Sequence, residues 1–397
     1  MERISTQQLH RQGINGILQN QVAVARLQAQ MATGARVQTA ADDPAAMAKI
    51  MNIDSALSDI GQWQSNIGTV QDRLGLEENA LNALNDVIDR VRQLGVQARS
   101  SALSDSDRNS IAAEMKELSA TLLSTANSRD SQGRYLFAGS RDGQAPFVRT
   151  SSGVQYRGDD TVSTLQVGSS RQIGLGDSGA DVFMRLRAGT GAASVSAASS
   201  NTGLAYVTSV DLTDAAAWSG GSYRLSFSGG NYEVTDAGGT VVSSGAYESG
   251  SAVAFGGLSI SLDGEPADGD SFSVGPAPTL DLFSTIDQIT RLVNLDDQSA
   301  AQSAQNQTAF FDALSALSAA QDHLGDVRGS VGSRLGAADD ASAQLSDRKL
   351  QLDSLRSGLH DLDYTQAAAD LSAKQTALAA AQQTYISIQK LSLFDYL

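Results

Sequence analysis

Residues 53–91 read IDSALSDIGQWQSNIGTVQDRLGLEENALNALNDVIDRV, and this stretch decides the fold. Large apolar residues recur in it every seven positions, and a second apolar set follows three residues after the first. The first set is Ile53, Ile60, Ile67, Leu74, Leu81 and Ile88, and the second is Ala56, Trp63, Val70, Leu84 and Val91. Because such a repeat leaves one seam of a helix to be buried against a partner, it predicts a long coiled-coil-like helix.

The start of this helix is also marked in the sequence. Asp43 can accept the free amide hydrogens of the first turn, and Pro44 fits the first helical position. The next proline is Pro146, so a helix can run unbroken through residues 45–98, or about 80 Å at 1.5 Å per residue. A second, shorter helix is predicted at about residues 107–130, after a turn rich in Ser and Asp.

A second heptad pattern fills the C-terminal part of the chain. It consists of Phe310, Leu317, Leu324, Val331, Ala338, Leu345, Leu352 and Leu359, with companions Ala313, Ala320, Val327, Ala341, Leu355 and Leu362. A new phase then begins, at Tyr364, Leu371, Leu378 and Tyr385. The change of phase indicates a short break near residues 361–363. Since neither seam can bury itself, the two helical blocks are expected to pack antiparallel and to bring the chain ends together.

Between the helical blocks the composition changes, because residues 140–278 are rich in Gly, Ser, Asp, Val and Thr. Tyr223, Leu225 and Phe227 alternate with polar residues before a predicted turn at 228–231. This alternation predicts a β meander inserted into a helical protein. The predicted fold class is therefore mainly α with a β-rich insert: a long antiparallel coiled-coil-like helical shaft with a β meander domain at its tip.

Three parts are expected along the chain. Residues 1–42 and 363–397 are predicted to form terminal assembly helices. Residues 43–139 and 279–362 are predicted to form a helical shaft domain. Residues 140–278 are predicted to form a β-rich outer insert domain.

Charge and composition exclude several classes of function. The formal net charge of -16 argues against a nucleic-acid partner, because phosphate binding needs clustered Lys and Arg. The chain has no polybasic stretch, no apolar run near the ~20 residues of a membrane helix and no apolar N-terminal run of signal-peptide length, so no membrane partner is expected. The sequence contains no cysteine, so neither disulfides nor thiolate metal ligands are available.

Residues that could carry chemistry are scattered. His10, His323 and His360 lie in separate segments, and none has a second histidine three or four residues away. The glycines of residues 174–179 have the spacing G-x-G-x-x-G, but they lie in the β-rich insert and are better explained as a loop. We therefore predict no catalytic residue, no metal site and no cofactor.

The candidate interaction residues are apolar side chains near the two chain ends. They are Ile14, Ile17, Val24, Leu27 and Met31, then Leu371, Leu378 and Tyr385, then Leu391, Leu393, Phe394, Tyr396 and Leu397. Either they bury one another in an intramolecular hairpin, or they form an interface for assembly or for a chaperone. Residues 1–32 are rich in Gln and have too little apolar surface for a stable lone helix, which favours the second interpretation.

Glu77 is a candidate for setting the register of the shaft, because it occupies a seam position where a carboxylate is costly to bury without a cation. We assume that the two long helices are antiparallel and that Pro44, at the start of the first, lies opposite Asp363 in the break after the second. The numbers of two facing residues then add to about 407. This register places Glu77 between Arg328 and Arg334. We predict that Glu77 approaches Arg334 or Arg328, and that the pair fixes helix register more than it adds stability.

Several short motifs resemble the flagellin superfamily of bacterial flagellar proteins. The first consists of Gly34, Arg36 and Asp42-Asp43-Pro44, and its Asp-Asp-Pro form is similar to the hook-associated members, since flagellin usually reads Asp-Asp-Ala or Asp-Asn-Ala. The others are Tyr135-Leu136-Phe137-Ala138-Gly139, Tyr156-Arg157-Gly158-Asp159, Val331-Gly332-Ser333-Arg334, Asp361-Leu362-Asp363-Tyr364 and the ending 391–397. The resemblance covers roughly residues 1–159 and 280–397.

The resemblance implies a structural subunit that is exported unfolded through the flagellar type III apparatus and assembles helically between hook and filament as a mechanical adapter. Its implied partners are further copies of itself, another hook-associated protein, flagellin and a flagellar export chaperone. It also implies an extracellular location and termini that are disordered in the monomer. The alternatives are a filament subunit, or a binding or enzymatic module carried by the insert, which contains one tryptophan, Trp218, and no histidine or cysteine.

Overall fold

The computed structural model describes residues 6–100, 103–295 and 299–394. The chain divides into two compact units, one of residues 66–340 and one of residues 1–65 together with 341–397. The helices are α1 (Thr6–Thr33), α2 (Pro44–Ala98), α3 (Asp105–Ala126), the one-turn π-helix η1 (Ala180–Met184), α4 (Leu282–Val293), α5 (Ala300–His360) and α6 (Tyr364–Phe394). Both α2 and α5 contribute residues to each unit.

All strands lie in the unit of residues 66–340. They are β1 (Phe147–Thr150), β2 (Gly153–Tyr156), β3 (Thr164–Gln166), β4 (Gln172–Gly174), β5 (Leu186–Arg187), β6 (Ala193–Ala197), β7 (Tyr206–Leu212), β8 (Tyr223–Ser228), β9 (Asn231–Asp236), β10 (Val241–Ala246), β11 (Ala252–Phe255), β12 (Leu258–Asp263), β13 (Ser271–Pro276) and β14 (Thr279–Leu280). The pairs β1–β2, β3–β4 and β14–β5 stand alone, and the other strands form sheets ordered β10-β9-β8-β13-β6 and β11-β12-β7.

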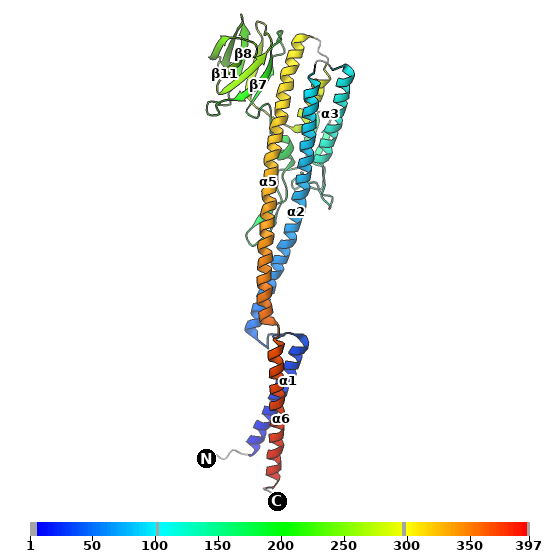
Figure 1. Cartoon of the computed structure of the whole chain (residues 1–397), viewed down its shortest axis with the longest axis vertical. Coiled ribbons are helices and arrows are strands. Elements are labelled where there is room, and N and C mark those ends of the chain that lie inside the picture. Colours follow the sequence, from blue (N-terminus) through cyan, green and yellow to red (C-terminus); the bar gives the residue numbers. More distant parts are fainter. Residues whose placement is uncertain (1–5, 101–102, 296–298, 395–397) are drawn as a thin grey trace. The chain divides into compact units, whose positions relative to one another are not determined.

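Antiparallel packing of α2 on α5 forms the centre of the larger unit (Figure 1). The heptad residues are its core, with Leu74, Leu81 and Ile88 of α2 fully buried. Two polar bridges flank the seam: Gln71 donates to Asp339 at 2.7 Å, and Gln321 donates to Asp89 at 2.7 Å. In both pairs the residue numbers add to 410, three more than expected. The predicted antiparallel shaft is therefore confirmed.

The smaller unit contains the first turns of α2 and the last turns of α5. Ile53, Ile60 and Leu352 form its core, and the same register of 410 recurs where Arg356 pairs with Asp54 at 2.7 Å. The prediction was wrong for Leu355, which is 55% exposed. An α-helix drifts by about 20° per heptad against a strict seven-residue repeat, so a long repeat gradually leaves the seam.

The ends of the helices follow their capping residues. Asp43 Oδ1 accepts the Ala46 amide hydrogen at 3.0 Å, and α2 begins at Pro44 as predicted. Ser104 accepts from the Asp107 amide and the Asp107 carboxylate accepts from the Ser104 amide, which starts α3 at Asp105. The predicted break near 361–363 separates α5 from α6.

The β-rich insert is confirmed, but a meander describes only part of it. Strands β8, β9 and β10 follow one another as predicted, with Gly229 and Gly230 taking positive φ angles of 57° and 75° in the first turn. However, β13 inserts between β8 and β6, and β7 joins β12 in the second sheet. Side chains from both sheets share one core, so the insert is a two-sheet sandwich.

Candidate functional site

The terminal helices α1 and α6 pack on each other (Figure 1). Most of the predicted interaction residues lie half-buried along this pair: Ile17, Val24, Leu27, Met31, Leu371, Leu378 and Tyr385. Ala367 is buried, and the Tyr364 hydroxyl donates to the Met31 carbonyl at 3.1 Å. The N-terminal segment thus has a helical partner within its own chain, whereas its sequence favoured an interface with another molecule.

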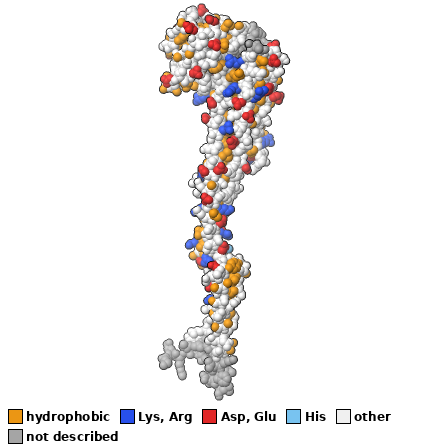
Figure 2. Space-filling model, in the orientation of Figure 1, with side chains coloured by type: hydrophobic (Ala, Val, Ile, Leu, Met, Phe, Trp, Pro, Cys, Tyr) orange, Lys and Arg blue, Asp and Glu red, His pale blue; other side chains and the backbone are white. Residues whose placement is uncertain are grey.

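One apolar stripe of α1 is left uncovered within the chain. Ile14, Leu18 and Val22, each one turn apart, are 43%, 52% and 68% exposed. Figure 2 shows apolar side chains on the visible surface of the terminal helices. The side chains of Leu391, Leu393 and Phe394, and all of Tyr396 and Leu397, lie outside the described residues, so their predicted role in an interface stays a prediction.

Two helix breaks, one near each end of the chain, are bonded to each other. The Arg36 amide donates to the His360 carbonyl at 2.7 Å, and the Leu362 amide donates to the Gly34 carbonyl at 2.9 Å. Gly34 has φ 72°, a conformation that favours glycine, and an added Cβ would meet the Tyr364 hydroxyl. The positive φ explains the glycine at position 34, and the side chain of Arg36 adds a hydrogen bond to the Leu359 carbonyl at 2.7 Å.

Asp42 orders the connection between α1 and α2. Its Oδ2 accepts from the amides of Gln38 and Thr39 at 3.1 and 2.9 Å, and Oδ1 pairs with Arg26 at 3.0 Å. Hydrogen bonds from Thr39 and Gln38 hold the pKa of the Asp42 carboxyl below its ordinary value. The Asp42-Asp43-Pro44 motif therefore has a divided task, because Asp42 closes the turn and Asp43 caps the helix.

Glu77 meets Arg334 through an intervening loop. Its Oε1 accepts the amide hydrogen of Asp177 at 2.9 Å, between β4 and η1. On the other side, Arg334 Nη1 donates to the Gly176 carbonyl at 2.9 Å and Nη2 binds the Asp177 carboxylate. Among the described residues no direct ion pair joins Glu77 to Arg334 or Arg328, and Arg328 Nε has no hydrogen-bond partner there. Arg334, not Arg328, shares this cluster with Glu77.

Arg73, which the sequence analysis did not single out, is a second buried charge on α2. It pairs with Asp130 at 3.1 Å and donates to the Tyr135 carbonyl at 3.0 Å. Burial, the largest influence, lowers the pKa of the Arg73 guanidinium. No local pattern in the sequence connects Arg73 with the Tyr135–Gly139 motif, because Arg73 and Tyr135 are 62 residues apart.

The Tyr135–Gly139 and Tyr156–Asp159 motifs form one docked corner. The Tyr156 hydroxyl donates to the carbonyls of Phe137 and Asp159 at 3.1 and 2.8 Å. Burial raises the pKa of Tyr156 to about 12. Hydrogen bonds from Ser140 and Thr161 hold the pKa of Asp159 at about 2. The motifs are thereby structural and position the chain at the entry to the insert.

The histidines lie apart from one another. His323 Nε2 contacts the Asp181 carbonyl at 2.8 Å and His360 Nδ1 contacts Asp361 at 2.8 Å, while the side chain of His10 lies outside the described residues. Within residues 6–100, 103–295 and 299–394, no three His, Asp or Glu side chains are grouped as metal ligands. In the same ranges, no helix is both long and apolar enough to span a bilayer.

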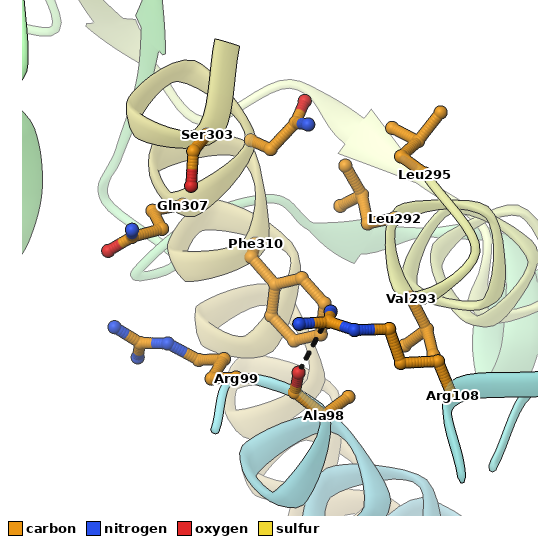
Figure 3. A pocket seen from close by; sticks show the side chains of 10 residues that line it. Ala98, Arg99, Arg108, Leu292, Val293, Leu295, Ser303, Gln307 and Phe310 are labelled. Atoms are coloured by element: carbon orange, nitrogen blue, oxygen red, sulfur yellow. Dashed lines mark hydrogen bonds between the residues drawn. The ribbon is translucent and has the colours of Figure 1, made fainter. Parts of the chain in front are cut away.

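A pocket of about 240 Å³ lies where α2 and α4 end and α3 and α5 begin. Figure 3 shows Phe310 facing it, with Arg108 in front of the ring and donating to the Ala98 carbonyl at 3.5 Å. Arg99 points away from Arg108 in this view. The two guanidinium groups therefore do not converge on a ligand position.

Comparison with known proteins agrees with this architecture. Residues 4–142 match the model of the bacterial flagellin N-terminal helical region, and residues 196–276 match the D2-like domain of flagellar hook-associated protein 1. The match to the flagellin N-terminal region contains α1, α2 and α3, and the match to the D2-like domain contains most of the two-sheet sandwich. The fold and the motifs thus define a flagellin-like protein with a hook-associated type of insert.

The crystal structure of FlgL from Xanthomonas campestris is 37% identical and covers 76% of this chain and 99% of its own, with a TM-score of 0.69. The chain belongs to the FlgL family. The flagellar junction protein FlgL from Legionella pneumophila is 29% identical, with a TM-score of 0.72 over 79% of this chain and all of its own.

Curated relatives match over a shorter span. Flagellar hook-associated protein 3 of Salmonella typhimurium is 34% identical over 181 residues, which is 46% of this chain and 56% of that protein. The chain thus spans little more than half the length of this relative. A flagellin of Listeria monocytogenes is 32% identical over 25% of this chain and 34% of its own.

Proposed function

We propose that this protein is a structural junction subunit of the bacterial flagellum, exported from the cell and assembled helically between hook and filament. The proposal rests mainly on the packing of α1 against α6. This pair brings the two terminal segments together and leaves Ile14, Leu18 and Val22 exposed in the monomer. Apolar side chains in a row at this exposure need a partner in the assembled state. Membership of the FlgL family supports the flagellar junction as that state.

In this proposal the three predicted parts have different tasks. Residues 1–42 and 363–397 contact neighbouring subunits, with further copies, another hook-associated protein and flagellin as partners. Residues 43–139 and 279–362 form the stiff shaft, and residues 140–278 form the outer domain. Each subunit offers different surfaces to its neighbours, which is the head-to-tail arrangement that generates rings and helical lattices.

Leu393 and Phe394 are proposed to bind an export chaperone or a neighbouring subunit. They belong to an ending with five large apolar side chains in seven residues. Changing both residues to Ser is expected to abolish secretion or incorporation. Normal export together with normal filaments would refute this role.

Deletion of the gene tests the proposed function. Cells without the protein should build hooks that carry no filament, and a plasmid copy should restore both filaments and motility. Copy number separates the junction from the filament alternative, because a filament subunit is present in vastly greater amount. Normal filaments in the deletion strain, or a filament-like abundance, would overturn the proposal.

The alternative of a catalytic or binding module rests on the insert. A hollow of about 550 Å³ in the insert is a shallow surface across β6, β8, β9 and β13, lined mainly by small polar residues such as Ser194, Ser196 and Ser273. The apolar core lies between the two sheets, away from this hollow. A variant that lacks residues 196–276 tests this alternative. If it still supports filament assembly but no longer binds a ligand that the full-length protein binds, the alternative is favoured.

A further inference from the structure

The two carboxyl oxygens of Glu77 have different surroundings. Glu77 is 2% exposed, and Oε1 accepts the Asp177 amide hydrogen at 2.9 Å. Oε2 is buried, and no donor reaches it among the described residues. An ionised oxygen buried without a donor carries a large desolvation cost. A protonated Oε2, in contrast, needs an acceptor and not a donor.

The carboxylate of Asp177 is the acceptor candidate, because the amide of the same residue already donates to Glu77. Two neighbouring carboxyl groups disfavour double ionisation, and after burial the negative charge of Asp177 is the next influence that raises the pKa of Glu77. Arg334 pairs with the Asp177 carboxylate, and among the described residues it forms no ion pair with Glu77. The proton therefore resides on Glu77.

We propose that Glu77, Asp177 and Arg334 form a proton-dependent tie, in which Glu77 Oε2–H donates to the Asp177 carboxylate and this carboxylate pairs with Arg334. The tie fastens the segment between β4 and η1 to α2 on one side and to α5 on the other. A single proton thus sets how firmly three elements that are distant in sequence are joined. The inference goes beyond the proposed function and does not depend on it.

The charges around Glu77 set the pH range of this tie. Burial first, and then the negative charge of Asp177, raise the pKa of Glu77 to about 8, against the opposing effect of Arg334. Arg73, one turn earlier on α2, is the other nearby cation, and it is occupied by Asp130. When Glu77 ionises, two carboxylates face the single guanidinium of Arg334, and the segment is held less firmly.

The direction of the pH dependence follows from the raised pKa. In the released segment Glu77 has its ordinary pKa near 4.5, so the tie is strongest below this value. It weakens by up to about tenfold per pH unit as pH rises from 4.5 towards 8, and it levels off above about 8.

Hydrogen exchange of residues 174–178 in the full-length protein tests the tie, after correction for the intrinsic pH dependence of exchange. Protection should fall from pH 5 to pH 8 in the wild type. In Glu77→Gln the amide nitrogen replaces the protonated oxygen as donor, so protection should be high and independent of pH. Circular dichroism provides the check that the variant is folded.

Infrared spectroscopy supplies the second readout, because a protonated carboxyl has a band that its carboxylate lacks. The wild type should lose such a band near pH 8, and Glu77→Gln should lack it at every pH. Exchange that is flat with pH in the wild type would overturn the proposal. So would a uniform loss of protection in Glu77→Gln, since that result indicates a purely structural acceptor.

Discussion

Asp312 on α5 accepts the backbone N–H of Val195 through Oδ1 at 3.2 Å, at the open edge of the five-stranded sheet. Four residues earlier on the same helix, Thr308 Oγ1 accepts the N–H of Val207 at 3.2 Å, at the edge of the second sheet. Free strand edges pair readily with other chains. Because α5 covers one edge of each sheet, at β6 and at β7, it protects these two edges from such association.

Asp312→Ala should loosen the insert at this edge. It leaves the Val195 amide and the Ser194 hydroxyl without their buried acceptor, at an expected loss of about 1–3 kcal/mol. Hydrogen exchange at Val195 should rise, and light scattering should show association that increases with concentration. Asp322→Ala, at an exposed position of the same helix, is the control and should change neither measurement.

Arg73→Met should be strongly destabilising. It leaves the buried Asp130 carboxylate with Arg134 alone and frees the Tyr135 carbonyl, which corresponds to about 3–5 kcal/mol in urea unfolding. The matched control is Arg90→Met, because Arg90 forms an exposed pair with Glu114. This control should leave the urea midpoint nearly unchanged, because an exposed ion pair contributes little to stability. Equal effects of the two changes would mean that the buried pair has no special role.

Asp159 should contribute to stability in mildly acidic and neutral solution and fail in strong acid. Its pKa is lowered to about 2 from an ordinary value of 3.8, so its contribution is complete above about pH 4 and is lost as pH falls through 2. Asp159→Asn should therefore flatten the acid limb of a plot of thermal midpoint against pH. Identical acid limbs in the two proteins would contradict the assignment.

Leu18→Ser with Val22→Ser should separate folding from assembly. Both side chains are exposed, so the thermal midpoint of the monomer should stay within a few degrees, while incorporation into flagella should fail. Leu350→Ser, at another exposed position of the same unit, is the control for a general effect of lost apolar surface. Motility retained by the double variant would remove α1 from the proposed interface.

Local patterns in the sequence predicted the helices well. The heptads, the cap at Asp43 and the change of phase near 361–363 each depend on neighbouring residues, and each appears in the structure. The antiparallel register was within three residues of the observed one. Periodic burial and helix capping are short-range effects, so one chain segment is enough to reveal them.

Contacts between distant segments were beyond such reasoning. Glu77 was expected to face an arginine, but the loop at Gly176 and Asp177, 100 residues away, lies between them. No period in the sequence connects β13 with β6, so a meander was expected instead of a sandwich. The packing of α1 on α6 was likewise not the favoured expectation, because no local pattern connects these two segments.

The bonds between Gly34 and Leu362 and between Arg36 and His360 also close a very long loop of the chain. The side chain of Arg36 reaches the Leu359 carbonyl, 323 residues further along the chain. Closing so long a loop is entropically unfavourable until the intervening chain has become compact. The first helix therefore lacks its partner until residues 34–363 have been made, because α6 begins only at Tyr364.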